Sequence, residues 1–419
     1  NFVRLPVKRV KTLPQSLLSF SRVALSSIVT SKATSRIVMV LCALMVLLSI
    51  SACGSKDSDD ELSKPLPLEK FEAKTKLKSQ WSASIGPGQG KRYDRLALGF
   101  DSDSVYAANV KGQVSRYGLQ GDLTWREKLE PLSAGVGVGE SLILLATANG
   151  VVVALNSDNG TEKWRKDVRG EVLAAPQASR GIAIVQTYDG RLIGLDADSG
   201  EQLWVYTSDT PVLTLRGTAT PVIENGIAYT GFATGKLVAI DITNGNLIWD
   251  KPVAIAKGQS EIDRIVDVDA SPLVSSSRVY AASFNGYLFA FLKRDGRPLW
   301  RFDISSYREV AEGFKNIYAV SEKGRLFAID AESGEQRWEQ SALLNRQLSA
   351  PVVFGGFLVV ADFDGYIHVM SQIDGAIIGR TKIDGSGVRV PMRVVDDLLY
   401  VYSNKGKLAA YTLENIVSK

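Results

Sequence analysis

A repeat of about 40 residues, marked by tryptophan, constrains the fold of this 419-residue chain more than any other feature. Each repeat runs through an alternating apolar stretch, a Gly-containing turn, a second apolar stretch, an Asp- or Asn-rich turn into Gly, and a last stretch that carries Trp, as in residues 182–204 and 227–249. All seven tryptophans occupy this last position, at Trp81, Trp125, Trp164, Trp204, Trp249, Trp300 and Trp338. With a short lead-in strand, each repeat supplies four strands, which is the period of a β-propeller.

The number of repeats predicts how the ring closes. Six copies are plain; a seventh, residues 358–380, has Gly379 where the Trp is expected, and an eighth, residues 399–413, stops before its last strand. Residues 76–86 carry Trp81 but have no repeat before them. We therefore predict an all-β fold over residues 76–419, an eight-bladed β-propeller of four-stranded blades in which the N-terminal and C-terminal strands complete one blade together.

The tryptophans are interpreted as structural, because one large ring per repeat can fill the space between the flat faces of two blades. Gly379 then predicts either a looser seventh blade or a neighbour that fills the gap. Glycines in the Asp- and Asn-rich turns are expected at positions of positive φ.

The N-terminal part reads as a lipoprotein signal. Residues 1–36 are interpreted as an upstream extension with a basic n-region, and residues 37–52 as an apolar h-region that is short for a transmembrane helix. This run ends in a sequence that resembles the bacterial lipobox, so Cys53 is predicted to be lipidated and to become the N-terminus; a plain secretory segment is the alternative. Residues 53–75 are rich in Ser, Asp, Glu, Lys and Pro and are predicted to form a flexible, lipid-anchored tether.

Cysteine usage and charge limit the compartment and the partners. The chain has no cysteine beyond Cys53, as suits an oxidising periplasm, and by resemblance to lipoprotein sorting signals Gly54 indicates the outer membrane. The first 52 residues contain seven Lys or Arg and no acidic residue, which leaves 42 basic and 45 acidic residues in the remainder. That remainder lacks the positive field that nucleic acid requires, so no nucleic-acid partner is predicted.

Signals for catalysis are weak. His368 is the only histidine, which excludes multi-histidine metal sites, and as a single strand histidine it is interpreted as a packing or surface residue. Four Asp-x-Asp pairs, which begin at Asp57, Asp101, Asp196 and Asp267, could suggest Ca²⁺, but the first lies in the tether and the others are interpreted as solvated turns. No phosphate-binding loop is present. We predict no catalytic residue, no metal and no cofactor.

Two connections between repeats are longer than a propeller needs, residues 210–221 and 261–272. Both combine apolar residues with charge, a composition typical of interaction surfaces. An ordinary lead-in strand is the alternative interpretation.

Two family resemblances follow from these motifs. The repeat LDADSGEQLW resembles the tryptophan-docking motif of the quinoprotein (PQQ-dependent) dehydrogenases, which are also eight-bladed, and a periplasmic enzyme of that kind is the alternative function. Such enzymes need an ordered Ca²⁺ site, a catalytic carboxylate and commonly a vicinal Cys pair, whereas this chain lacks cysteine after Cys53 and is shorter.

The lipobox, the tether, the repeats and the two long connections together resemble the outer-membrane protein assembly lipoprotein, the propeller subunit of the β-barrel assembly machinery. The resemblance implies a non-enzymatic scaffold that is lipid-anchored to the outer membrane of a Gram-negative bacterium, faces the periplasm and docks on the POTRA domains of the barrel-forming subunit. Unfolded outer-membrane proteins are a further possible partner, through exposed strand edges. The docking positions that the resemblance implies are Leu213, Leu215, Arg216, Asp267 and Asp269. The two aspartates are expected either to meet the partner or to hold Arg216 in place.

Overall fold

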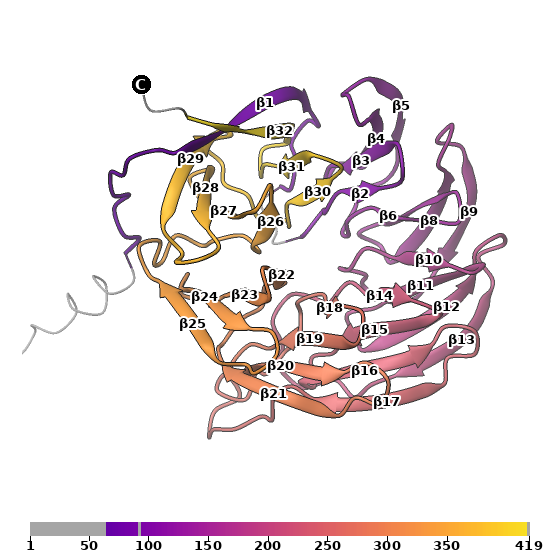
Figure 1. Ribbon diagram of the computed structural model, residues 1–419. Coiled ribbons are helices and arrows are strands. Elements are labelled where there is room, and N and C mark those ends of the chain that lie inside the picture. Colours follow the sequence, from indigo (N-terminus) through magenta and orange to yellow (C-terminus); the bar gives the residue numbers. More distant parts are fainter. Residues whose placement is uncertain (1–63, 91–93, 417–419) are drawn as a thin grey trace, which may run out of the picture. The chain divides into compact units, whose positions relative to one another are not determined.

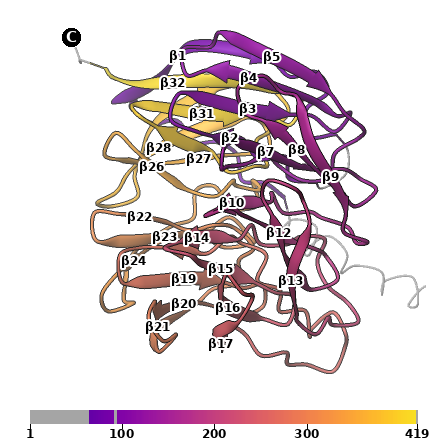
Figure 2. The ribbon, with the colours of Figure 1, turned by 90° about the vertical axis from the view of Figure 1, so that its right-hand side faces the viewer.

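The computed structural model describes residues 64–90 and 94–416, which form eight four-stranded antiparallel sheets arranged as the blades of one ring (Figure 1). The predicted eight-bladed β-propeller is confirmed. Figure 2 turns the ring so that the outer strands of the second and third blades face the viewer. No helix in these two ranges has the length and apolar character that a membrane span requires.

Each blade runs in chain order from an inner strand at the axis to an outer strand at the rim. The first four blades are β2 (Gly99–Phe100), β3 (Ser104–Ala108), β4 (Gln113–Gly118) and β5 (Leu123–Lys128); β6 (Gly137–Gly139), β7 (Leu142–Ala146), β8 (Val151–Asn156) and β9 (Glu162–Asp167); β10 (Gln177–Ser179), β11 (Ile182–Gln186), β12 (Arg191–Asp196) and β13 (Gln202–Thr207); β14 (Val222–Glu224), β15 (Ile227–Gly231), β16 (Lys236–Asp241) and β17 (Leu247–Pro252).

The other four blades follow the same order, and the last one takes its outer strand from the start of the propeller. They are β18 (Leu273–Val274), β19 (Arg278–Ala282), β20 (Tyr287–Leu292) and β21 (Pro298–Asp303); β22 (Ala311–Gly313), β23 (Asn316–Val320), β24 (Leu326–Asp330) and β25 (Gln336–Gln340); β26 (Val352–Phe354), β27 (Phe357–Ala361), β28 (Tyr366–Ser371) and β29 (Ile377–Lys382); β30 (Arg393–Val395), β31 (Leu398–Tyr402), β32 (Lys407–Asn415) and β1 (Thr75–Ser84).

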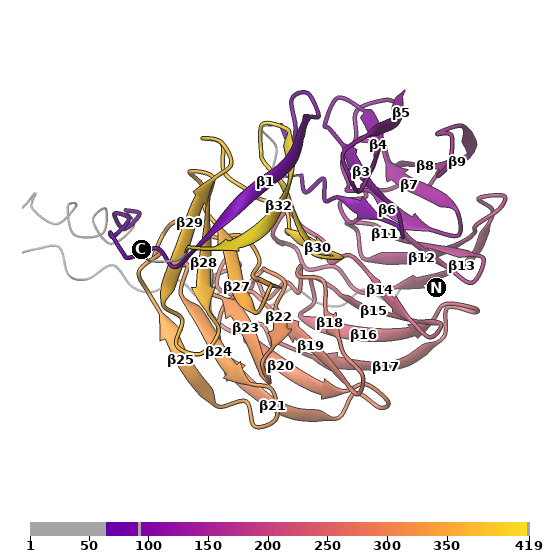
Figure 3. The same ribbon diagram turned by 45° about the horizontal axis from the view of Figure 1, so that its top comes forward.

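The eighth blade closes the ring as the sequence predicts. β1 pairs antiparallel with β32, and Trp81 lies opposite Ala410 in this register. Figure 3 shows the indigo β1 lying beside the yellow β32. Ladder hydrogen bonds between the two ends of the propeller therefore join the ring.

Each tryptophan joins its blade to the next one. The Trp164 indole Nε1 donates a hydrogen bond to the Ala197 carbonyl in the following blade, at 2.8 Å, and the ring lies against Gly200, where an added Cβ would come within 2.6 Å of it. Gly200 has a φ of +73°, so it supplies both the turn and the flat surface for the ring. The other six tryptophans also donate to a carbonyl of the next blade, which confirms their structural role.

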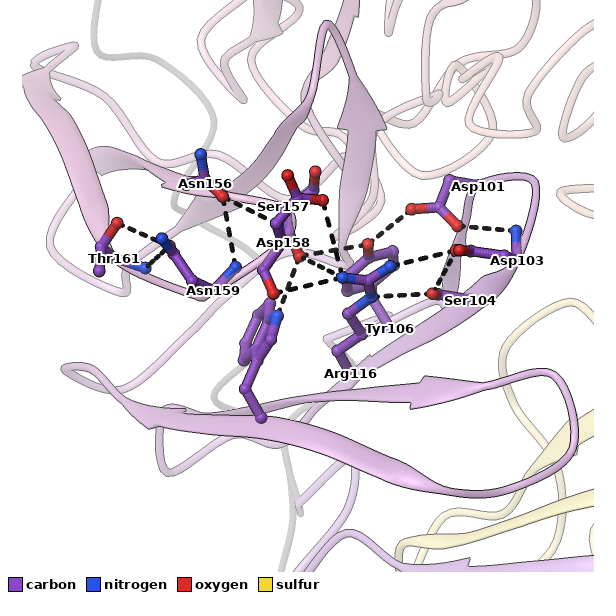
Figure 4. A network of polar contacts seen from close by, with 11 residues as sticks. Asp101, Asp103, Ser104, Tyr106, Arg116, Asn156, Ser157, Asp158, Asn159 and Thr161 are labelled. Carbon is purple, nitrogen blue, oxygen red and sulfur yellow. Dashed lines mark hydrogen bonds and ion pairs between the residues drawn. The ribbon is translucent and has the colours of Figure 1, made fainter.

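Polar side chains reinforce these joints, as Figure 4 shows between the first two blades. Arg116 of β4 donates hydrogen bonds to the carbonyls of Ser157 and Asp158 in the next blade and pairs with Asp103 in its own blade, at 3.1 Å. The Tyr106 hydroxyl donates to Asp101, at 2.6 Å. Asp101 and Asp103 thus stabilise a turn and a blade joint, in agreement with their interpretation as turn residues.

Gly379 follows from the way the ring closes. In the other blades the tryptophan of the preceding blade docks on the turn between the third and fourth strands, but in the eighth blade these strands are β32 and β1, which no turn connects. The chain at Thr75 takes that place: a Cβ on Gly379 would lie 2.6 Å from the Thr75 carbonyl oxygen, and Lys74 N–H donates to the Ile378 carbonyl, at 2.8 Å. A neighbour therefore fills the gap, which was one of the two predicted alternatives.

Residues 64–74, from the predicted tether, lie along the seventh blade; we call them the strap. Leu66 N–H donates to the Leu344 carbonyl, at 3.1 Å, and the Arg380 guanidinium contacts the Phe71 ring, 4.9 Å from its centroid, and donates to the Glu69 carbonyl. The strap therefore belongs to the ordered propeller. Cys53, the signal segment and the remainder of the tether lie outside the described residues.

Candidate docking site

The two long connections lie on one face of the ring. Because the strands of a blade alternate in direction, the connection from an outer strand to the next blade and the hairpin between second and third strands emerge on the same face. We call this the connector face. Residues 208–221 join β13 to β14, and residues 253–272 join β17 to β18, so both predicted stretches fall here.

Asp267 fixes one connection to the other. Its side chain is fully buried, and its Oδ2 accepts a hydrogen bond from the backbone N–H of Leu215. Its Oδ1 has no hydrogen-bond partner among the described residues. Burial, with a smaller contribution from Asp269, raises the pKa of Asp267 to about 7.

Asp269 supports the next turn of the same connection. It is buried, and a Cβ on Gly217 would lie 2.6 Å from its Oδ2, so only glycine fits there without a shift of the carboxylate. Burial raises the pKa of Asp269 to about 6. The interpretation of Asp267 and Asp269 as a solvated turn is therefore wrong, because both carboxylates lie beneath the connector face.

Arg216 has partners other than these aspartates. Its guanidinium forms a bidentate ion pair with Glu171, with N–O distances of 3.0 and 2.8 Å, and a further ion pair with Asp94, at 3.0 Å. The expectation that Asp267 or Asp269 holds Arg216 is therefore wrong. The hydrogen bonds to Glu171, which outweigh burial, raise the pKa of Arg216. Because its partners come from two other connections, Arg216 links three separate segments of the connector face.

Apolar side chains stand beside this charge. Leu213 has 41% of its surface exposed, while Leu215 is half-buried and faces the axis of the ring. Sequence reasoning missed Val212, which is 93% exposed, and Ile255 and Ile262, which are exposed on the second connection. Their signal was an apolar residue in a connection without strand alternation. Such residues can supply desolvated contact area to a partner.

The described residues give little support for a catalytic histidine or a metal site. His368 is fully buried, with Nε2 3.2 Å from an Asp362 carboxylate oxygen and Nδ1 accepting from Arg380, and burial lowers its pKa. It is a packing histidine, as one of the sequence interpretations held. No group of three or more His, Cys, Asp or Glu side chains in residues 64–90 and 94–416 could hold a metal ion.

Comparison with known proteins gives a consistent result. The family model described as outer membrane protein assembly factor BamB matches residues 110–340 and 328–415. A Pseudomonas aeruginosa protein of that name is 43% identical over 373 residues, which cover 88% of this chain and 98% of the relative. A Vibrio cholerae protein of that name is 36% identical over 381 residues, which cover 90% of this chain and 98% of the relative.

Solved structures agree with the sequence comparison. The crystal structure of BamB from Moraxella catarrhalis superposes with a TM-score of 0.74 at 28% identity and covers 80% of this chain and 99% of that one. A quinohemoprotein alcohol dehydrogenase from Comamonas testosteroni also superposes, with a TM-score of 0.64, at 12% identity, covering 80% of this chain and 76% of that one. The second likeness concerns the fold alone.

Proposed function

Since this chain belongs to the family of the outer membrane protein assembly factor BamB, and is an assembly factor and not an enzyme, we propose that it docks on the POTRA domains of a barrel-forming subunit and assists insertion of β-barrel proteins. Membership of this family decides against the quinoprotein alternative. The dehydrogenases share the fold at 12% identity, whereas named assembly factors are 43% and 36% identical over almost their whole length.

The observation that carries the docking proposal is the cross-linked pair of connections. Asp267 of one connection binds the backbone of Leu215 in the other, and Arg216 is fixed by Glu171 and Asp94. The exposed side chain of Leu213 therefore stands on a base of defined shape. A preorganised apolar surface beside a charge loses little entropy when it binds. In this proposal Leu213, Leu215 and Arg216 contact the partner, while the buried Asp267 and Asp269 hold the first connection in place from beneath.

The proposal includes the anchor. Lipidation of Cys53 would hold the chain at the periplasmic side of the outer membrane, where a barrel-forming subunit is found. The strap supports this arrangement, because Asn345 Nδ2 donates to the Lys64 carbonyl, at 3.0 Å, and Asn345 belongs to an outer-to-inner connection of the connector face. Lys64, the first described residue, therefore lies on the face that carries the docking connections.

Photo-crosslinking in intact cells tests the docking proposal. A photoreactive residue in place of Leu213 is expected to capture the barrel-forming subunit, and Arg216→Glu is expected to abolish the crosslink, because it places a carboxylate beside Glu171 and Asp94. The matched control is the same photoreactive residue in place of Phe314, which is 70% exposed in the β22–β23 hairpin on the opposite face. Equal capture from both positions, or none from Leu213 in a folded, anchored protein, contradicts the proposal.

A second candidate function, direct binding of unfolded β-barrel precursors, has one specific observation in its favour. The outer strand β13 exposes Leu203 and Val205, and the outer strand β17 exposes Leu247 and Ile248. Each of these strands is paired on one side only, so an extended segment could add to its free edge. A photoreactive residue in place of Leu203 is then expected to capture precursor proteins. Capture of no precursor there would exclude this edge.

A further inference from the structure

The blades enclose a cavity of about 850 Å³ at the axis of the ring, lined by inner strands and by connections of the connector face. Its walls are largely apolar and include Phe100, Val136, Leu348 and Val394. Both the volume and the apolar lining are typical of sites for small organic ligands.

Arginines give the cavity an excess of positive charge. Five line it, Arg95, Arg216, Arg308, Arg389 and Arg393, against the carboxylates of Asp269 and Glu309. Glu309 pairs with Arg393, at 2.9 Å, and Arg216 is neutralised by Glu171 and Asp94. Arg95 and Arg308 also line the cavity, outside these pairs.

Arg95 and Arg308 meet on one aromatic ring. The guanidinium carbon of Arg308 lies 4.3 Å from the Tyr307 ring centroid, and that of Arg95 lies 5.8 Å from the same centroid. Arg95 comes from the segment before the first blade and Tyr307 from the connection before the sixth, so this contact spans the axis. Two cations are thus held near each other at the cavity wall.

Arg308 is a buried cation whose hydrogen bonds go to neutral oxygens. Its side chain is 8% exposed and donates to the carbonyls of Leu348 and Ser321 and to the Tyr307 hydroxyl. Among the described residues no carboxylate lies within 4.0 Å of it or of Arg95. A guanidinium has five N–H donors, so three hydrogen bonds leave donors for a ligand.

The charges near this pair do not neutralise it fully. Burial lowers the pKa of Arg308 and the proximity of Arg95 lowers it further, whereas Tyr307 and, more weakly, the carboxylate of Glu322 raise it. Asp269 interacts electrostatically with Arg95, but its own burial raises its pKa to about 6. A buried positive charge without a carboxylate in direct contact is costly, and an anion in the cavity would relieve that cost.

We propose that the axial cavity binds an organic carboxylate with an apolar body, whose carboxylate pairs with Arg95 and Arg308 and whose body packs on the apolar wall. A guanidinium binds the two oxygens of a carboxylate in a bidentate geometry. The ligand is either a free small acid or the C-terminus of a peptide. Leu215, Arg216 and Asp269 of the docking connections also line this cavity, but Arg95 and Arg308 lie outside those two connections, so ligand binding is tested without a partner protein.

Calorimetric titration of the purified propeller with N-acetylphenylalanine, its amide and an apolar pentapeptide with a free C-terminus tests the proposal. The acid is expected to bind at least about tenfold more tightly than the amide, which cannot form the ion pair. Tighter binding of the pentapeptide than of the acid identifies a peptide C-terminus as the ligand, and weaker binding identifies a free acid. Equal binding of acid and amide, or equal binding of inorganic phosphate, overturns the proposal.

Two variants test the named arginines. Arg95→Gln and Arg308→Gln are each expected to weaken binding of N-acetylphenylalanine by at least about tenfold. The matched control is Arg301→Gln, which changes an exposed arginine on the outer strand β21 and is expected to leave binding unchanged. If Arg308→Gln fails to fold, the test rests on Arg95→Gln, because Arg95 is partly exposed. Unchanged affinity of Arg95→Gln for N-acetylphenylalanine overturns the assignment.

Discussion

The buried carboxylate of Asp267 is expected to make the stability of the propeller depend on pH. Its pKa of about 7 in the folded chain lies far above the value near 4 of an unfolded aspartate, so the folded state holds the proton more tightly. Its contribution to stability is therefore complete below about pH 4 and is lost as the pH rises toward 7. Each pH unit in this window changes the free energy of unfolding by up to about 1.4 kcal/mol.

Asp267→Asn removes this titration and keeps an oxygen that accepts the Leu215 N–H. Between pH 5 and pH 7 the free energy of unfolding of the unaltered protein should fall relative to that of Asp267→Asn, by at most about 3 kcal/mol. The limit is an upper one because local opening can hydrate the carboxylate.

Urea unfolding at several pH values, followed by tryptophan fluorescence, measures this difference. The same comparison with Asp397→Asn, which alters an exposed carboxylate in the β30–β31 hairpin, serves as the control and should show little pH dependence. A difference between the unaltered protein and Asp267→Asn that stays constant from pH 5 to pH 8 would refute the assignment of a raised pKa.

Three further predictions concern the ring. In urea unfolding, Gly200→Ala should destabilise the propeller by at least about 2 kcal/mol more than the control Gly181→Ala. Both glycines have positive φ, but an added Cβ at Gly200 would meet the Trp164 indole, whereas at Gly181 it would meet nothing within 4 Å. Gly379→Trp restores the sequence repeat yet should lower the thermal midpoint, because the Thr75 carbonyl occupies that space; a raised midpoint would contradict this. Arg380→Ala should speed proteolysis within the strap more than it lowers the thermal midpoint, and an unchanged cleavage rate would exclude its role there.

The ring could be predicted from the sequence because its information is local and repeated. All blades but the seventh carry their own Trp, and all but the eighth have a turn glycine before the outer strand, so the spacing alone indicates the number of blades and their closure. The reason for Gly379 was out of reach, since it depends on Thr75 at the other end of the propeller. A repeat pattern does not say which neighbour occupies the place of a missing ring.

The candidate docking site could likewise be predicted only in part from the sequence. Length and composition were enough to identify the two long connections, but not the partners of the charges within them. Arg216 pairs with Glu171 and Asp94, which belong to connections of other blades, and the burial of Asp267 depends on how one connection folds over the next. Irregular segments have no period from which to derive an inner and an outer face, so only the structure identifies Asp267 as a support.

The contacts of residues 208–221 distinguish the residues that the ring holds in place from those that are exposed to a partner. Four consecutive residues are each held by another part of the ring. Tyr188 contacts Thr214 through its hydroxyl, at 2.7 Å, Glu171 and Asp94 hold Arg216, and the second connection holds both Leu215, through Asp267, and Gly217, through Asp269. The two residues before them, Val212 and Leu213, are exposed. A partner carboxylate would have to compete with Glu171 for Arg216, so the charge adds less to affinity than an unpaired arginine would. In the docking proposal Arg216 then matters chiefly because it fixes the base on which Val212 and Leu213 are presented, and these apolar side chains are expected to supply most of the binding energy.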